Sequence, residues 1–239
     1  MKNYVSVLLL CTISFSHCKG QVSPIGEEPL LLENFRFDTK ISELYPDKNK
    51  SKKYEGYFEV MGTMRPQMVL KDSTYVNEFT TGKKAIGIEY RQQTSTSIDT
   101  MAMFGNQAFQ KLNIATTPDG KIKIINAVAE NLTAEQADEF IKRLINEYGT
   151  PRKLKSSWND EFTIYQWSET KKIIRFVSAY NDESNSLKIA VDADKKTASP
   201  GKKEPHFVGY FYIINPAMQE DVFGKVKTGD FAYLGEKGK

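Results

Sequence analysis

Side chains that can act as nucleophiles, bases or metal ligands are few in this chain of 239 residues. It has two histidines, His17 and His206, and two cysteines, Cys11 and Cys18. Only His206 lies beyond the first eighteen residues. A zinc site with several histidines and a Cys–His catalytic pair are therefore excluded from the rest of the chain, because each needs at least two such side chains.

Motifs for phosphate binding and nucleophilic catalysis are also absent from the sequence. It contains no G-x-x-x-x-G-K-[ST] loop and no G-x-G-x-x-G loop, and no serine stands in a G-x-S-x-G elbow. The run Asp192-Ala193-Asp194 begins like a calcium loop, but the glycine and final glutamate of such a loop do not follow. We predict no metal and no cofactor, and we interpret His206 as a strand-edge residue rather than a base.

Two carboxylates facing one cleft could hydrolyse glycosides, with one acting as the acid and the other as base or nucleophile. Asp160 and Glu161 precede a predicted strand, where catalytic acids are often found. The chain has 30 acidic residues, however, and the sequence does not single out a pair. We interpret Asp160 and Glu161 as a solvated turn and predict no enzymatic activity, with a carboxylate-type hydrolase as an alternative.

Aromatic side chains are the best candidates for binding a ligand, because their rings can stack on sugars or pack on peptides. Trp158, Tyr210 and Tyr212 are the ligand-binding candidates, and Trp167 and Tyr233 could extend the same platform. The competing interpretation places these rings in the core or in cross-strand pairs. We favour the structural interpretation and keep a carbohydrate- or peptide-binding role as an alternative.

A helix between Leu132 and Pro151 is the clearest element that could position such residues. Thr133 and Gln136 form a T-x-x-Q capping box, which satisfies two backbone N–H groups at the helix start. Gly149 is suited to the end of a helix, and the proline that follows prevents its continuation. The apolar residues repeat at helical spacing and form one stripe: Ala137, Phe140, Ile141, Leu144, Ile145 and Tyr148. Since a helix of this length is marginal alone in water, we expect it to pack on strands.

Alternating or apolar runs around this helix predict strands, and clusters of Gly, Pro and polar residues predict the loops between them. We expect strands at 54–61, 74–80, 84–93, 109–116, 121–129, 162–168, 172–180, 187–192 and 206–215. We expect a weaker helix at 34–44 and long loops at 92–108 and 194–205. This pattern predicts an α+β fold in which antiparallel sheet packs against one or two helices.

Two stretches of the chain resemble each other and suggest an internal duplication. Residues 76–86 and 164–174 share an ungapped pattern of aliphatic, Glu or Gln, aromatic, hydroxyl, two turn residues, Lys-Lys and Ile. Further on, 112–115 resembles 187–190. We interpret this as a helix followed by a three-stranded meander, used twice, with convergence of similar hairpins as the alternative.

The composition is that of an ordinary globular protein, with 40% hydrophobic and 26% charged residues. The net charge of +3 is small, and no long basic stripe is visible. These features argue against nucleic-acid binding, which uses a strongly basic surface.

The N-terminus has the features of an export signal. Lys2 provides a positive start, and Val5 to Phe15 is a mostly apolar run that is too short to span a bilayer. No later stretch of the sequence is apolar enough to span one. We therefore predict that the exported protein is not an integral membrane protein.

The end of this segment, Phe15-Ser16-His17-Cys18, resembles the lipobox of bacterial lipoproteins. The resemblance covers about the first eighteen residues and implies that Cys18 becomes the first mature residue and carries lipid. The family prefers leucine where Phe15 stands and a small residue where His17 stands. The alternative is ordinary cleavage, with Ser14 and Ser16 as the small residues of the cleavage site, which would release a secreted protein.

These observations divide the chain into a signal peptide (1–18), an extended tether (19–32), a first α+β half (33–120) and a second α+β half with a C-terminal aromatic strand (121–239). We predict a non-enzymatic binding or scaffold protein of the cell envelope, attached to the membrane by an N-terminal lipid on Cys18. Its partner would be another envelope protein or a glycan. A secreted binding module and a carboxylate-type hydrolase are the alternatives.

Overall fold

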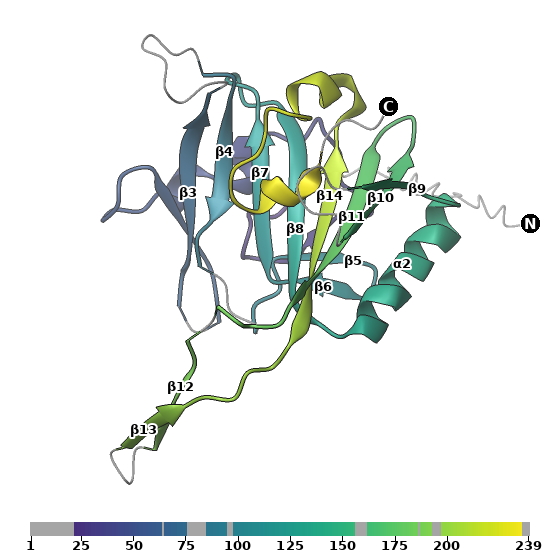
Figure 1. Ribbon diagram of the computed structural model, residues 1–239. Coiled ribbons are helices and arrows are strands. Elements are labelled where there is room, and N and C mark those ends of the chain that lie inside the picture. The colour runs from purple at the N-terminus through teal and green to yellow at the C-terminus, as the bar shows by residue number, and fades with distance from the viewer. Residues whose placement is uncertain are drawn as a thin grey trace, which may run out of the picture.

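A nine-stranded antiparallel sheet, in the order β2-β3-β4-β7-β8-β14-β11-β10-β9, forms the body of the protein (Figure 1). The computed structural model describes residues 22–63, 65–75, 85–94, 98–155, 162–185, 187–192 and 197–235. The strands of the large sheet are β2 (Tyr57–Val60), β3 (Gln67–Thr74), β4 (Gly87–Gln92), β7 (Lys111–Thr116), β8 (Ile122–Leu132), β9 (Arg152–Lys155), β10 (Thr163–Ser168), β11 (Ile173–Asn181) and β14 (His206–Ile214).

The remaining elements cover this sheet or extend from it. Two smaller sheets consist of β1 (Leu30–Leu31), β5 (Ala102–Phe104) and β6 (Gln107–Phe109), and of β12 (Ile189–Asp192) and β13 (Thr197–Pro200). The helical segments are α1 (Ile41–Leu44), η1 (Asp47–Asn49), α2 (Ala134–Tyr148), η2 (Pro216–Asp221) and η3 (Gly229–Leu234). Antiparallel sheet on a helix agrees with the predicted α+β class, although strands dominate.

Two long strands, β8 and β14, lie side by side at the centre of the sheet. Their residues are buried on both faces, as expected for strands with continuous apolar runs. In β14, Phe211 and Ile213 belong to the core on one face, while Tyr210 and Tyr212 belong to the core on the other. The aromatic strand therefore joins two separate cores.

Helix α2 covers the first of these faces. Its capping box is present, because Gln136 N–H donates to Thr133 Oγ1 at 3.1 Å and Thr133 N–H donates to Gln136 Oε1 at 2.9 Å. Phe140 lies at the centre of an aromatic cluster, and its ring centroid is 5.0 to 5.8 Å from those of Phe104, Phe109, Phe176 and Phe211. The predicted helix and its buried stripe are confirmed, except that Ile145 is exposed.

The C-terminal segment, residues 215–235, covers the second face with η2 and η3 (Figure 1). It contributes four buried apolar side chains to the second core: Val222, Val226, Phe231 and Leu234. The aromatic residues on both faces of the strand expected at 206–215 indicate such a cover, by the tail or by a partner, and the structure identifies the tail.

Residues 22–32 belong to the folded body rather than to a tether. Leu30 and Leu31 form β1 and pair in parallel with Ala102 and Met103 of β5. Ile25 and Leu32 are fully buried in the first core. The prediction of an extended tether over 19–32 is therefore wrong for 22–32, because the apolar side chains of this stretch have a place in the core.

Several predicted boundaries are also corrected. The helix expected at 34–44 is limited to the single turn α1, the loop expected at 92–108 contains β5 and β6 begins within it, and the loop expected at 194–205 contains β13. The two expected halves are parts of one sheet, since β7 and β8 are hydrogen-bonded to each other across the boundary at residue 120.

The described residues do not form the predicted helix–three-strand unit twice. β10 and β11 make a tight hairpin with Ser168 opposite Ile173, whereas β4 pairs with the earlier residues of β3, with Gly87 opposite Thr74. The expected third strand of the second unit, β12, pairs with β13, and β11 pairs with β14. Most of the strand expected at 74–80 lies outside the described residues, and Thr74 is the last residue of β3. The similar hairpin sequences therefore have different registers and neighbours.

Candidate functional site

The predicted site residues do not come together in the described part of the chain. Cys18 and Trp158 lie outside the described residues, as do Asp160 and Glu161. The remaining candidates, Tyr210 and Tyr212, are buried under the C-terminal segment.

Tyr210 and Tyr212 are core residues and do not form an accessible platform. The ring of Tyr210 stacks on that of Tyr233, with centroids 4.0 Å apart. Tyr212 is fully buried, and its hydroxyl donates to the Asp230 carbonyl at 2.7 Å. Burial raises the pKa of both phenols above the ordinary value. The ligand-binding interpretation is wrong for both residues, because the tyrosine side chains on this face of β14 point into the second core.

Two other residues have the structural roles that we predicted. Trp167 is buried, and its indole Nε1–H donates to the Gly149 carbonyl at 2.8 Å. His206 stands at the start of β14, with Nδ1 2.9 Å from the Glu204 carbonyl and 3.8 Å from Glu183 Oε1. These contacts connect ends of neighbouring segments and do not create a nucleophile–base pair.

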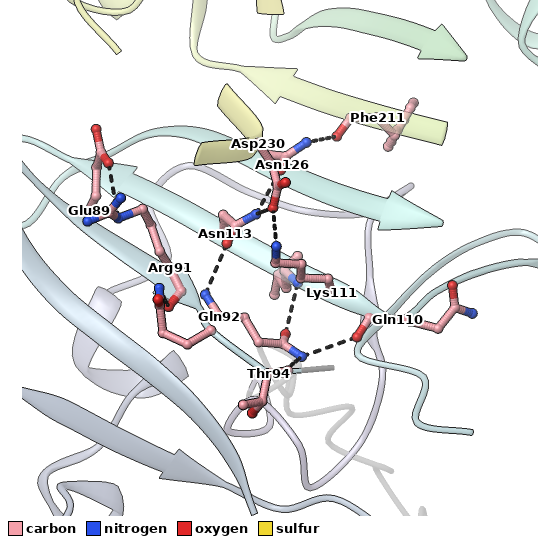
Figure 2. Close-up of polar contacts among 12 residues, drawn as sticks. Glu89, Arg91, Gln92, Thr94, Gln110, Lys111, Asn113, Asn126, Phe211 and Asp230 are labelled. Atoms are coloured by element: carbon pink, nitrogen blue, oxygen red, sulfur yellow. Dashed lines mark hydrogen bonds and ion pairs between the residues drawn. The ribbon is translucent and has the colours of Figure 1, made fainter. Parts of the chain in front are cut away.

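A buried polar cluster lies between the sheet and the C-terminal segment (Figure 2), and we define it as Glu89, Arg91, Lys111, Asn113, Asn126 and Asp230. Asn113 is its centre. The Asn113 side-chain amide donates to Asn126 Oδ1 and to Asp230 Oδ2, both at 2.9 Å. Its Oδ1 accepts from the backbone N–H of Gln92 at 3.0 Å. The polar cluster thus connects β4, β7 and β8 with η3.

Asp230 anchors the C-terminal segment to this cluster. Besides the bond from Asn113, its carboxylate forms an ion pair with Lys111, whose Nζ is 2.6 Å from Oδ2. Both side chains are mostly buried, at 19% and 23% exposure. A charge-assisted contact that is shielded from water is stronger than a surface pair. This contact therefore helps to hold η3 on the sheet.

Arg175 of β11 provides a second anchor for the same segment. Its guanidinium donates to the Leu234 carbonyl at 2.6 Å and to Gln166 Oε1 at 2.8 Å, and it lies 4.1 Å from the centroid of the Phe223 ring. Burial lowers its pKa to about 10. Arg175 therefore remains charged at neutral pH while it binds the C-terminal segment.

Glu89 and Arg91 are incompletely hydrogen-bonded members of the polar cluster, since Glu89 Oε1 and Arg91 Nε both lack a hydrogen-bond partner among the described residues. Glu89 is 2% exposed. Arg91 Nε lies 3.6 Å from the other carboxylate oxygen of Glu89. Burial raises the pKa of the Glu89 carboxyl, while Thr74, Arg91 and Thr228 oppose the increase. Ionising the Glu89 carboxyl is therefore less favourable in the folded protein than in water.

Gln92 and Gln110 connect the polar cluster with the C-terminal end of β8. The Gln92 side chain accepts from Leu112 N–H at 3.0 Å and donates to the Gln110 carbonyl at 3.2 Å. Gln110 Oε1 in turn accepts from the backbone N–H of Glu130 at 2.9 Å. These bonds position the wall of an open pocket.

This pocket has a volume of about 310 Å³ and lies between β6, the end of β8 and the first turn of α2. Its lining is Asn106, Gln107, Ala108, Gln110, Glu130, Asn131, Leu132 and Gln136. Most of these residues carry amides, and one carries a carboxylate. Amides offer donors and acceptors together, so the pocket is suited to a neutral ligand with several hydroxyl or amide groups.

The pocket's amides are held in place by bonds to the protein. Asn106 Oδ1 accepts from Arg143 at 2.6 Å, Gln107 Nε2 donates to the Ala108 carbonyl at 2.8 Å, and Gln136 Oε1 is occupied by the capping box. These bonds fix one end of each of the three amides. Asn131 has a φ of 89°, a left-handed conformation that is uncommon for residues other than glycine.

Neither the polar cluster nor the pocket was predicted from the sequence. A signal was present for the cluster, because Asn113 and Asn126 interrupt strands that are otherwise apolar on their buried faces. A buried amide needs a hydrogen-bond partner, so such interruptions predict a polar contact. The pocket gave no comparable signal, since its amides come from separate segments whose proximity depends on the fold.

No three His, Cys, Asp or Glu side chains of the described residues gather into a group that could hold a metal ion. None of the helices in this part of the chain combines the length and the apolar composition needed to cross a membrane. Comparison with protein-family models, with curated proteins and with solved structures finds no match to this chain.

Proposed function

We propose that this protein is a non-enzymatic binding protein of the cell envelope, attached to the membrane by a lipid on Cys18. The amide-lined pocket beside α2 is the observation that supports binding best. Its lining includes one carboxylate, that of Glu130, whereas hydrolysis of glycosides normally uses two. A hydroxyl-rich ligand, such as a saccharide of the envelope, fits these donors and acceptors.

The location is supported by the sequence of the export segment. Phe15-Ser16-His17-Cys18 resembles a lipobox, and the folded body begins shortly afterwards, with Ile25 already in the core. Only a short connection therefore separates Cys18 from the body.

The anchor can be tested with the full-length chain in a bacterial host that processes lipoproteins. Mass spectrometry of the mature N-terminus should find a diacylglyceryl group on Cys18, and Cys18→Ala should abolish it and release the protein from the membrane fraction. An unmodified mature N-terminus would instead favour the secreted alternative.

The pocket can be tested with a panel of soluble cell-wall oligosaccharides. We expect a member of the panel to bind, and Gln107→Ala to weaken its binding about tenfold, the cost of one lost hydrogen bond in a binding site. Gln93→Ala is the matched control, because Gln93 carries the same amide at an exposed position away from the pocket. Absence of binding across the panel, or equal effects of the two variants, would contradict the saccharide proposal.

A further inference from the structure

The hairpin of β12 and β13, with the described residues that flank it (187–192 and 197–203), forms an arm that extends from the body (Figure 1). Its register places Ile189 opposite Pro200 and Ala190 opposite Ser199, and Gly201 N–H donates to the Lys188 carbonyl. Residues that lie directly opposite each other share a face of a two-stranded ribbon, and successive residues alternate between faces. The arm therefore has two chemically different faces.

One face of the arm is apolar and accessible. It includes Ile189 and Pro200, and also Leu187 and Ala198, which lie two residues away along their strands. Leu187 is 87% exposed and Ile189 is 59% exposed. A two-stranded ribbon is marginally stable in water without a surface to cover its apolar face. Two exposed aliphatic side chains on one such face therefore indicate a docking surface.

The charge of the arm identifies the kind of surface that it would meet. In the described part of the arm, Lys188, Lys202 and Lys203 outnumber the single acidic residue, Asp192. Lys188 pairs with Glu183 at 2.8 Å, Lys203 donates to the Ser184 carbonyl at 2.9 Å, and Lys202 is exposed. An apolar face bordered by cationic side chains complements a membrane surface that carries anionic lipids.

We propose that the apolar face of this arm docks on the surface of an anionic lipid bilayer. Leu187 and Ile189 would enter the interface between headgroups and acyl chains, and the lysines would remain among the phosphates. Because the arm projects from the body, it can reach a flat surface before the body does (Figure 1). The choice of a lipid surface rests on the proposed envelope location, but the contact itself does not require a lipid on Cys18.

Vesicle binding by a chain without its export segment tests this proposal separately from lipidation. Residues 19–239 contain every described element and lack Cys18. We expect this protein to sediment with vesicles of phosphatidylcholine and phosphatidylglycerol, to bind pure phosphatidylcholine vesicles much more weakly, and to be released by added salt. Leu187→Gln combined with Ile189→Gln should weaken binding at least about tenfold, because the aliphatic contact is lost without a change in charge.

The matched control places the same two glutamines on the opposite face of the arm, as Ala190→Gln combined with Ser199→Gln. This variant should bind within about twofold of the unmodified protein, since the apolar face is intact. All of these positions are exposed or lie in the exposed ribbon, and unchanged circular dichroism and thermal unfolding would verify the fold. Absence of binding to anionic vesicles, or equal losses in both variants, would overturn the proposal. Self-association that depends on Leu187 and Ile189, without vesicle binding, would assign the face to a second copy of the chain and would also overturn it.

Discussion

Asn113 and Asn126 lie side by side in strands whose neighbouring side chains are mostly apolar, and each finds its partner within the fold. Asn113 bonds to Asp230 as well, so its two amide hydrogens are used. Glu89, in the adjacent strand β4, is different, because one of its carboxylate oxygens has no hydrogen-bond partner among the described residues. The members of the polar cluster therefore differ in how much they stabilise the fold. A substitution at Glu89 should increase the free energy of unfolding.

Glu89→Gln is expected to increase the free energy of unfolding at neutral pH by about 1 kcal/mol, because an amide carries no charge to desolvate. Burial raises the pKa of Glu89 in the folded state above its ordinary value of 4.5. Between these two pKa values Glu89 binds more protons in the folded state than in the unfolded state, so the contribution of Glu89 to stability should fall as the pH rises. Below the ordinary pKa, Glu89 is protonated in both states and this advantage of the variant should disappear.

Urea unfolding over a series of pH values would measure this difference. Glu139→Gln on the exposed face of α2 is the control, and it should follow the wild-type pH dependence. The burial argument would be refuted if Glu89→Gln showed the same difference from wild type at acidic and neutral pH.

Helix α2 has its start specified by local sequence and its position specified by the core. The capping box of Thr133 and Gln136 forms as predicted. The glutamine also contributes to the wall of the pocket, as does Asn131 near the end of β8, which has a left-handed backbone. The start of α2 therefore determines the shape of the pocket as well as the end of β8.

Thr133→Ala should lower the free energy of unfolding by about 1 kcal/mol, because the N–H of Gln136 loses its acceptor. Thr133→Ser keeps a hydroxyl at the same place and should retain most of the stability. Urea unfolding, together with hydrogen exchange in the first turn of α2, would measure both effects. Equal losses in the two variants would mean that the methyl group of Thr133, rather than the cap, stabilises the helix.

The whole molecule consists of one sheet with two unlike covers. On the first face, α2 and the small sheet of β1, β5 and β6 contribute an extensive aromatic core. On the second face, the C-terminal segment is short and has little regular structure of its own. Its attachment depends on apolar side chains such as Phe231 and on the anchors at Asp230 and Arg175.

Asp230→Ala should destabilise the protein by about 2 kcal/mol, because it removes the ion-pair partner of Lys111 and one of the two acceptors of the Asn113 amide in a mostly buried site. Asp221→Ala is the control in the same segment. It removes an exposed ion pair with Lys225 and should change stability by less than about 0.5 kcal/mol.

Urea unfolding would compare these two variants, and limited proteolysis would show whether the C-terminal segment detaches first. Similar stabilities for Asp230→Ala and Asp221→Ala would show that the apolar contacts alone hold the segment on the sheet.

The sequence by itself determined the elements whose signals are local. The start and end of α2 and most of the strands followed from capping residues and apolar periodicity, because each depends on neighbours within a few positions. The roles of Trp167 and His206 were also predicted. The lipobox-like residues before Cys18 belong to the same local kind of information, and lipidation there stays a prediction.

Only the tertiary structure decided which surfaces are buried and which remain accessible. Tyr210 and Tyr212 were candidates for a platform until the C-terminal segment was found to cover them, and Ile25 and Leu32 were assigned to a tether until they were found in the core. The insertion of β14 between β8 and β11, the amide-lined pocket and the extended arm all depend on contacts between residues distant in sequence. Such contacts are set by how the two faces of the sheet are packed, and local patterns contain little information about them.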